Sequence, residues 1–280
     1  MLIRLGEFDF TEVWDGVLYR RLSGYPGITP WEKRTLAEFV AYEQAMGREC
    51  PIECDDAALL EEVREALAEP HRWRDVPPPG LITECTACPA WRGCVTTHVC
   101  HTASPESAAS ILRTGWLLSA VKARGLSGEE LAVEPRNAAK DPPDYFDYVM
   151  FTWGNCQAGD RLVTERRLGR FPDESDLSAG FEPGVRFYFR YDRLKEHPAA
   201  VFDGVLPLKI RDGVRLADWL HAVVIPQALR SALAPLMPPE LAERAVYLPY
   251  EGEGLWGWTE KVYRRIGGGA EGFTFAELTP

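Results

Sequence analysis

The spacing of apolar residues predicts a mostly helical N-terminal part. Short alternating stretches within residues 1–28 indicate strands and turns. A helix is predicted to begin after Thr29, because Pro30 suits the first helical position and Glu32 completes a capping box with Thr29. A second helix is predicted over about 55–69, where leucine and valine recur at helical spacing.

In the remainder of the chain the pattern changes to one dominated by strands. A β-branched run over 96–102 predicts a strand, and Ser104 followed by Pro105 predicts the start of a helix that ends at Gly115. A polar loop is expected over about 122–144. Short helices are predicted near 227–234 and 238–245, and strands over 147–153, 185–191, 200–210, 220–226, 245–249 and 258–266.

These patterns predict an α+β protein with two parts. Residues 1–95 are expected to form a mostly helical portion with a cysteine cluster, and residues 96–280 an α+β portion with a mainly antiparallel sheet. Apolar residues make up 46% of the chain and aromatic residues 11%, which supplies enough burial to exclude general disorder. No apolar stretch reaches the roughly 18–20 residues of a membrane span, so no membrane partner is expected.

The net charge and the N-terminal segment indicate where the protein acts and which partners it does not bind. Acidic residues stand where a secretory signal would be apolar, so a cytoplasmic protein is predicted. The chain holds 31 Lys and Arg against 42 Asp and Glu, and this net charge of −11 argues against strong non-specific binding to nucleic acid. The arginines between Arg161 and Arg170 form either a local basic patch or, as we favour, a solvated surface turn.

Six of the seven cysteines fall between Cys50 and Cys100. Since the cytosol keeps thiols reduced, and a C-x2-C spacing lets two thiolates share one soft cation, the cluster is predicted to bind metal. A zinc ion or a [4Fe-4S] cluster would be structural here, because no open-coordination motif accompanies the cysteines. The alternative is a set of free buried thiols. The candidate ligands are Cys54, Cys85, Cys88, Cys94 and Cys100.

The segment that follows the cysteine cluster resembles a known family. His101-Thr102, Ser110-Ile-Leu112 and Leu117-Leu-Ser119 are similar to the opening strand and helix of the ADP-ribosyltransferase superfamily. The branch concerned holds DarT-like enzymes, which modify thymidine in DNA, and tRNA 2′-phosphotransferases. The resemblance spans about residues 97–266 and implies a split-sheet domain that takes NAD as substrate.

Two later segments extend the resemblance. Asp147–Gly154 resembles the strand that lines the nicotinamide pocket in the DarT-like branch, and Tyr250–Tyr263 more loosely resembles the loop and strand that place a catalytic glutamate. The resemblance implies that His101 binds the nicotinamide ribose, while a strand edge and an aromatic ring hold the nicotinamide. The implied cofactor-binding residues are His101, Thr102 through its backbone, Tyr148, Phe151 and Trp153.

Breaking the nicotinamide–ribose bond passes through an oxocarbenium-like cation, which a nearby carboxylate stabilises. Within the late segment Glu260 is the first candidate, with Glu253 and Glu251 behind it, and His101 completes the catalytic pair. Glu260 beside Lys261 is alternatively a solvent-facing cross-strand pair. Along a strand Phe151 and Trp153 face one side and Tyr148 the other, so only one set can face a ligand, and such aromatic residues also fit a core.

The leading prediction is therefore an NAD-dependent ADP-ribosyltransferase with a structural metal portion in front of it. The acceptor of ADP-ribose is a nucleobase, a phosphate on RNA or a protein side chain. Two alternatives come from other classes: a non-catalytic metal-binding interaction protein, and an iron–sulfur protein that acts in redox or nucleic-acid processing.

Overall fold

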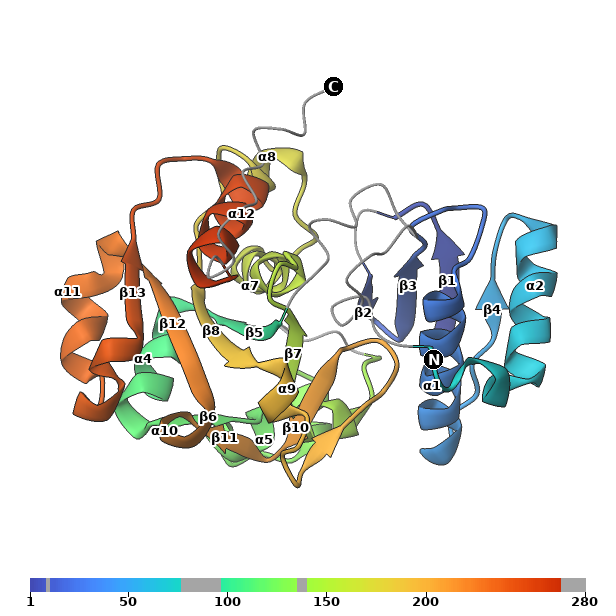
Figure 1. Cartoon of the computed structure of the whole chain (residues 1–280), viewed down its shortest axis with the longest axis horizontal. Helices are drawn as coiled ribbons and strands as arrows, with labels where there is room; N and C mark the ends of the chain where they lie inside the picture. The colour runs from blue at the N-terminus through green and yellow to red at the C-terminus, as the bar shows by residue number, and fades with distance from the viewer. Residues whose placement is uncertain (9–10, 77–96, 135–139, 268–280) are drawn as a thin grey trace.

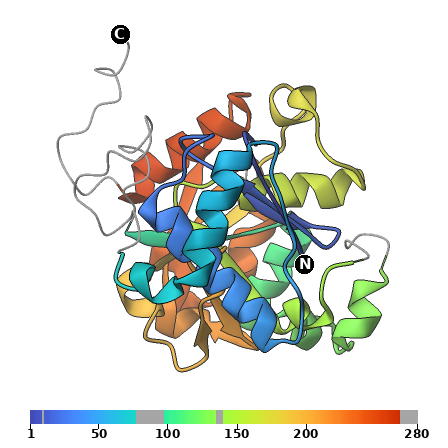
Figure 2. The ribbon, with the colours of Figure 1, turned by 90° about the vertical axis from the view of Figure 1, so that its right-hand side faces the viewer.

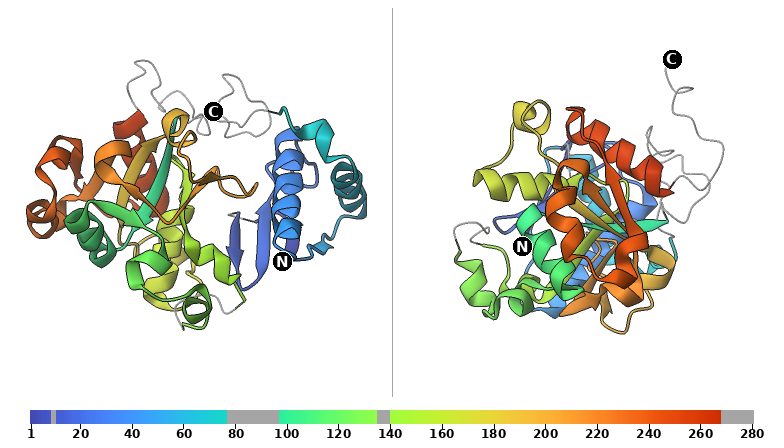
Figure 3. Two further views of the ribbon diagram at one scale, coloured as in Figure 1. Left: turned by 90° about the horizontal axis from the view of Figure 1, so that it is seen from below. Right: turned by 90° about the vertical axis from the view of Figure 1, so that its left-hand side faces the viewer.

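A computed structural model of the chain describes residues 1–8, 11–76, 97–134 and 140–267. The fold is mixed α+β, as predicted, and residues 1–76 (the N-terminal region) lie beside residues 97–267 (the C-terminal region), each with its own sheet (Figures 1 and 3). The predicted boundary at residue 95 lies outside the described residues. Within these ranges, no helix combines the length and the apolar character needed to cross a bilayer.

The N-terminal region is built on a small four-stranded sheet of order β2-β3-β1-β4. β1 pairs in parallel with both β3 and β4, whereas β2 and β3 form an antiparallel hairpin that turns at Asp15 and Gly16. The short strands predicted near the N-terminus are therefore present. Their bounds are Leu2–Gly6 for β1, Glu12–Trp14 for β2, Val17–Arg21 for β3 and Ile52–Glu53 for β4.

Two helices cover this sheet, α1 over Pro30–Ala45 and α2 over Ala57–Ala68 (Figure 2). The capping box predicted for the first helix is confirmed, because the Thr29 hydroxyl accepts from Glu32 N–H while the Glu32 carboxylate accepts from Thr29 N–H. The two helices and the sheet enclose one apolar core. Its most buried members are Ile3, Leu18, Leu36, Phe39, Leu59 and Val63.

The C-terminal region contains a seven-stranded sheet of order β13-β12-β8-β5-β7-β10-β9, and a separate pair, β6 and β11. Every neighbouring pair in the large sheet is antiparallel except β12 with β13, so the predicted mainly antiparallel sheet is confirmed. The bounds are His98–Ala103 (β5), Trp116–Leu118 (β6), Tyr148–Trp153 (β7), Val185–Arg190 (β8), Ala200–Val201 (β9), Leu208–Arg211 (β10), Gly213–Arg215 (β11), Leu220–Pro226 (β12) and Ala245–Leu248 (β13).

Helices cover both faces of the large sheet (Figure 1). On one face lies α4, Pro105–Thr114, which starts at the predicted Ser104 cap and ends at Gly115. It packs with Val99, Phe151 and Phe187 in the largest apolar core. On the opposite face lie α7, Ala158–Leu168, and α12, Gly254–Gly267.

The strand predicted over 258–266 is wrong, because this segment belongs to α12. Leu255, Trp258 and Val262 are fully buried against Tyr188 of the sheet, and their spacing of three and four residues is that of one helical face. The aromatic content of the segment favoured a strand, whereas its apolar spacing agrees with the helix.

The remaining helices are short and connect the strands. The loop expected over 122–144 contains α6 and the end of α5, and the helices predicted near 227–234 and 238–245 are present as short turns. Their bounds are Pro70–Trp73 (η1), Ala120–Arg124 (α5), Gly128–Ala132 (α6), Pro143–Asp147 (η3), Glu174–Leu177 (α8), Tyr191–Leu194 (α9), Leu216–Trp219 (α10), Gln227–Leu229 (η4), Arg230–Leu233 (α11), Ala234–Leu236 (η5) and Pro239–Arg244 (η6).

Candidate active site

The predicted site residues His101 and Thr102 lie where the pairing between β5 and β7 ends. β5 pairs with β8 along its whole length, but its ladder with β7 stops at Cys100. Beyond that point the His101 side chain joins the two strands, because its Nδ1 donates to the Met150 carbonyl at 2.9 Å. Burial lowers the pKa of His101, the bond to Met150 opposes this, and the positive charge of Arg166 lowers it further. Neutral His101 therefore offers Nε2 as a hydrogen-bond acceptor.

Because peptide groups point to alternate sides along a strand, the N–H and C=O of Thr102 point toward β7. The His98 carbonyl accepts from Gly154 N–H at 2.8 Å, and the Cys100 carbonyl accepts from the Thr152 hydroxyl at 3.3 Å. Since alternate residues of a strand direct their backbone groups to the same side, Thr102 directs its N–H and C=O to this side too. The ladder with β7 has ended before Thr102, so its peptide groups face a side without a paired strand.

A buried ion pair holds α7 against this end of β5. Arg186 and Asp160 are both inaccessible to solvent, with Arg186 Nε 2.8 Å from Asp160 Oδ2. The same carboxylate oxygen lies 3.5 Å from the Thr102 hydroxyl. A Cβ added to Gly159 would lie 2.6 Å from that hydroxyl, so only glycine allows α7 to approach so closely.

The guanidinium of Arg186 makes two further bonds that fix the turn between β7 and α7. It donates to the hydroxyl of Tyr188 at 2.7 Å and to the carbonyl of Cys156 at 2.6 Å. The Tyr188 hydroxyl in turn donates to the Gly154 carbonyl at 3.1 Å. A buried pair with this many bonds keeps its geometry, and removing one partner costs on the order of 3–5 kcal/mol.

The predicted aromatic platform is not assembled at this place. Phe151 has no exposed surface and packs on Phe189, and Trp153 packs on Tyr191, so both are core residues in this structure. Tyr148 faces the other side of the sheet, as the alternation predicted, and its ring lies 4.6 Å from the ammonium of Lys209. Phe151 meets the His101 ring edge-on at 6.2 Å between centroids, but it offers no exposed surface to a ligand.

Glu260 lies on the solvent side of α12 rather than on a strand. Its carboxylate pairs with Arg264 one helical turn later, and the neighbouring Lys261 pairs with Glu251 at 3.0 Å and Glu253 at 2.9 Å. The buried face of the helix belongs to Trp258 and its apolar neighbours. The predicted catalytic carboxylate is therefore an exposed helical ion pair, and the structure does not bring it to His101.

The cysteines that the structure describes do not converge. Cys54 packs against the core of the N-terminal region, whereas Cys100 lies beneath α12 in the C-terminal region. Burial raises the pKa of Cys100 to about 12. Cys54 and Cys100 therefore lie in different apolar clusters, and their role as metal ligands stays a prediction. Cys85, Cys88 and Cys94 lie outside the described residues, and elsewhere no group of three or more possible ligands is found among the residues described.

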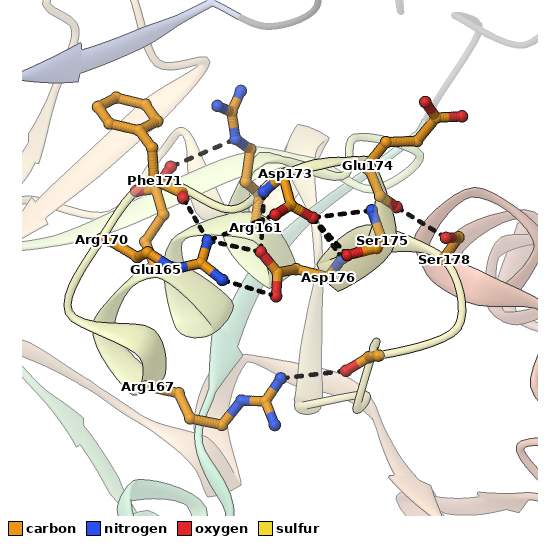
Figure 4. A network of polar contacts seen from close by, with 11 residues as sticks. Arg161, Glu165, Arg167, Arg170, Phe171, Asp173, Glu174, Ser175, Asp176 and Ser178 are labelled. Atoms are coloured by element: carbon orange, nitrogen blue, oxygen red, sulfur yellow. Dashed lines mark hydrogen bonds and ion pairs between the residues drawn. The ribbon is translucent and has the colours of Figure 1, made fainter.

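The arginines between Arg161 and Arg170 belong to α7 and the loop after it, not to a turn (Figure 4). Arg167 pairs with Glu182 at 2.7 Å and Arg170 with Asp176 at 2.7 Å. Arg161 lies 3.6 Å from Glu12 and 3.3 Å from Glu165. Since three of the four arginines are paired with carboxylates, this segment does not form a free basic patch.

Three carboxylates near α7 have raised pKa values. Burial, followed by the charge of Glu12, raises the pKa of Glu165 to about 7, although Arg161 opposes this. Burial also raises the pKa of Glu12, and raises that of Asp141 to about 6. A cluster of such shifts is typical of functional or regulatory positions.

The polar residues of α7 were missed by sequence reasoning. Asp160, Thr164 and Glu165 are its buried residues, so its inner face carries almost no apolar periodicity. The signal available was the Gly159-Asp160 pair directly after a strand and a turn.

A shallow cavity of about 410 Å³ lies away from this site, against α11, lined by Gln227, Arg230, Ser231, Ala234 and Pro235. Comparison of the chain with protein-family models, curated proteins and solved structures found no match.

Proposed function

We propose that the chain is an NAD-dependent ADP-ribosyltransferase whose nicotinamide site lies where β5 separates from β7. The observation that carries this proposal is the end of the β5–β7 ladder at Cys100, which leaves the peptide groups of Thr102 facing a side without a paired strand. A nicotinamide carboxamide has one donor group and one acceptor group, and a strand edge complements both. The adjacent His101 then offers Nε2 to a ribose hydroxyl.

The reaction also requires a carboxylate close to the ribose, to stabilise positive charge as nicotinamide leaves. Asp160 contacts Thr102, whereas Glu260 is exposed on α12. Asp160 Oδ2 is held by Arg186, while Oδ1 is buried and has no hydrogen-bond partner within the described ranges. We therefore assign the charge-stabilising role to Asp160 in place of Glu260.

The proposal also covers the partners and the location. The acceptor of ADP-ribose is a macromolecule that offers a nucleobase, an RNA phosphate or a protein side chain, and the enzyme acts in the cytoplasm. Zinc or [4Fe-4S] binding by ligands drawn from Cys54, Cys85, Cys88, Cys94 and Cys100 stays a prediction, and the proposed reaction uses no step through a metal.

Release of nicotinamide from NAD tests the proposal. His101→Ala should weaken NAD binding, because the ribose contact is already present in the ground state. His197→Ala is the matched control, since its imidazole accepts from Ala199 N–H at 3.1 Å, away from β5. Absence of nicotinamide release and of NAD binding in the wild-type protein would overturn the proposal.

A second pair of variants tests the carboxylate. Asp160→Asn keeps the shape of the side chain and should lower turnover by on the order of a hundredfold while NAD still binds, the usual result of losing a transition-state contact. Glu260→Gln should leave both quantities unchanged. Circular dichroism of Asp160→Asn verifies that the fold persists, and a Glu260→Gln protein that loses turnover would return the role to Glu260.

A further inference from the structure

Within the described residues, the N-terminal region meets the C-terminal region through two separate contacts. The first, here the α1 contact, surrounds Lys209 of β10, which is fully buried. Its ammonium lies 3.0 Å from Asp203 and 3.9 Å from the ring centre of Tyr42 on α1. Nearby, Arg48 pairs with Asp144 at 2.7 Å across the same boundary. Lys209 and Asp203 are shielded from water in this contact, whereas the side chains of Arg48 and Asp144 are 24% and 27% exposed.

The second, here the hairpin contact, joins the β2–β3 hairpin to α7 and its flanking segments. Arg161 lies between Glu12 of the hairpin, at 3.6 Å, and Glu165 of α7, at 3.3 Å. The ring of Trp14 meets that of Phe171 edge-on at 5.4 Å between centroids. At the hairpin turn, Gly16 N–H donates to Asp141 Oδ1 at 3.4 Å and Lys140 pairs with Asp15 at 3.1 Å.

In the described part of the hairpin contact, Glu12, Glu165 and the Arg161 between them carry one more negative than positive charge when both carboxylates are ionised. Glu12 and Glu165 share the guanidinium of Arg161, and Glu165 has a side chain only 2% exposed. Arg166 is a second cation beside Glu165 and also lies near Asp141. Asp141 itself faces Asp15 and the Gly16 amide. A proton on one carboxylate removes the repulsion between Glu12 and Glu165 and leaves one full ion pair with Arg161.

We infer that the hairpin contact is a proton-controlled contact, closed when one of Glu12 and Glu165 is protonated and loosened when both are ionised, while the α1 contact keeps the two regions joined. The geometry supports this, because the two carboxylates come from different regions and meet at one guanidinium. Burial raises the pKa of both carboxylates, that of Glu165 to about 7, so loosening is expected as the pH rises through neutrality.

Loosening would act on α7, which carries Asp160 in its first turn and Glu165 five residues later. Any effect of this loosening on the reaction rests on the proposed function, whereas the loosening of the hairpin contact does not. The experiment therefore measures the contact and not turnover, so that failure of the transferase proposal leaves its result valid.

Fluorine NMR of the full chain labelled with 5-fluorotryptophan tests the inference. The resonance of Trp14 is identified by its loss in Trp14→Phe, and Trp14 reports its contact with Phe171. Between pH 5 and 9 the wild-type resonance should show one titration step with a midpoint near 7. Glu165→Gln and, independently, Glu12→Gln should abolish the step.

Glu182→Gln is the matched control, because Glu182 pairs with Arg167 of the same helix within the C-terminal region. It should titrate as the wild type does. The inference is overturned if the Trp14 resonance stays constant from pH 5 to 9, or if both glutamine variants at positions 12 and 165 titrate like the wild type. Two independent variants keep the test decisive should one of them fail to fold.

Discussion

The α1 contact and the hairpin contact join the same two regions with the same kinds of side chain, yet they differ in how completely charge is matched. In the α1 contact Glu43 receives two bonds from Arg48, at 2.7 and 2.9 Å, and one from the Tyr145 hydroxyl at 3.1 Å. In the hairpin contact two carboxylates share Arg161 at 3.3–3.6 Å. Burial therefore stabilises an ion pair only when hydrogen bonds satisfy its members, and otherwise makes the pair sensitive to pH.

Lys209→Ala should have the largest effect, because it removes the cation at the centre of the α1 contact and leaves Asp203 buried beside tyrosine rings. A loss of about 3–5 kcal/mol in the free energy of unfolding is expected for breaking a buried pair. Urea unfolding measures it. The control is Lys195→Ala, whose ammonium pairs with Glu196 at the surface and should cost about 0.5 kcal/mol or less. Equal losses in the two variants would show that the α1 contact is no stronger than a surface pair.

Gly204→Ala should have the next largest effect. Gly204 has a φ of +78°, and an added Cβ would lie 2.1 Å from the Thr35 carbonyl and 2.5 Å from Phe39 N, both on α1. Strain and overpacking together should cost roughly 2–4 kcal/mol in unfolding free energy. Gly169, with a φ of +67° and open space around it, is the matched control, where alanine pays only the backbone cost of about 1 kcal/mol. A smaller loss at Gly204 than at Gly169 would mean that α1 does not dock as described.

The smallest effect concerns the hairpin contact and its pH dependence. Because the pKa of Glu165 is raised to about 7 in the folded state from about 4.5 in the unfolded state, its protonation favours folding, and this contribution is lost as the pH rises from 4.5 through 7. Glu165→Gln should flatten that part of the stability profile and be more stable than the wild type at pH 8 by roughly 1–2 kcal/mol. Urea unfolding at pH 5 and 8, with Glu182→Gln as control, measures it. A wild-type advantage at pH 8 would contradict the sign.

Local signals in the sequence predicted the helix starts and the antiparallel character of the large sheet. The Thr29 and Ser104 caps are set by residues within three positions, so sequence alone contains them. The helix over α12 was misassigned because aromatic residues outweighed the spacing of Leu255, Trp258 and Val262. In a segment rich in Trp and Tyr, the spacing of the apolar residues is therefore a better guide to helix or strand than the composition.

The site could be predicted only in part. His101 and Thr102 are adjacent in the sequence and reach the same place, but the partners that define the site come from far along the chain. Asp160 and Arg186 meet Thr102 only through the pairing of β5 with β8 and the return of α7, which no local pattern specifies. The place of Glu260 on a helix was not predicted for the same reason, since it depends on which face of α12 is buried.

NMR of the histidine imidazoles during titration with NAD shows whether nicotinamide binds beside His101, because only five histidines occur in the chain. With ¹⁵N-labelled histidine and each signal assigned by substitution, the resonances of His101 should move as NAD saturates the protein. Those of His71 and His197 should stay in place. His101 resonances that remain unchanged at saturating NAD, or changes confined to other histidines, would contradict a nicotinamide site at the end of β5.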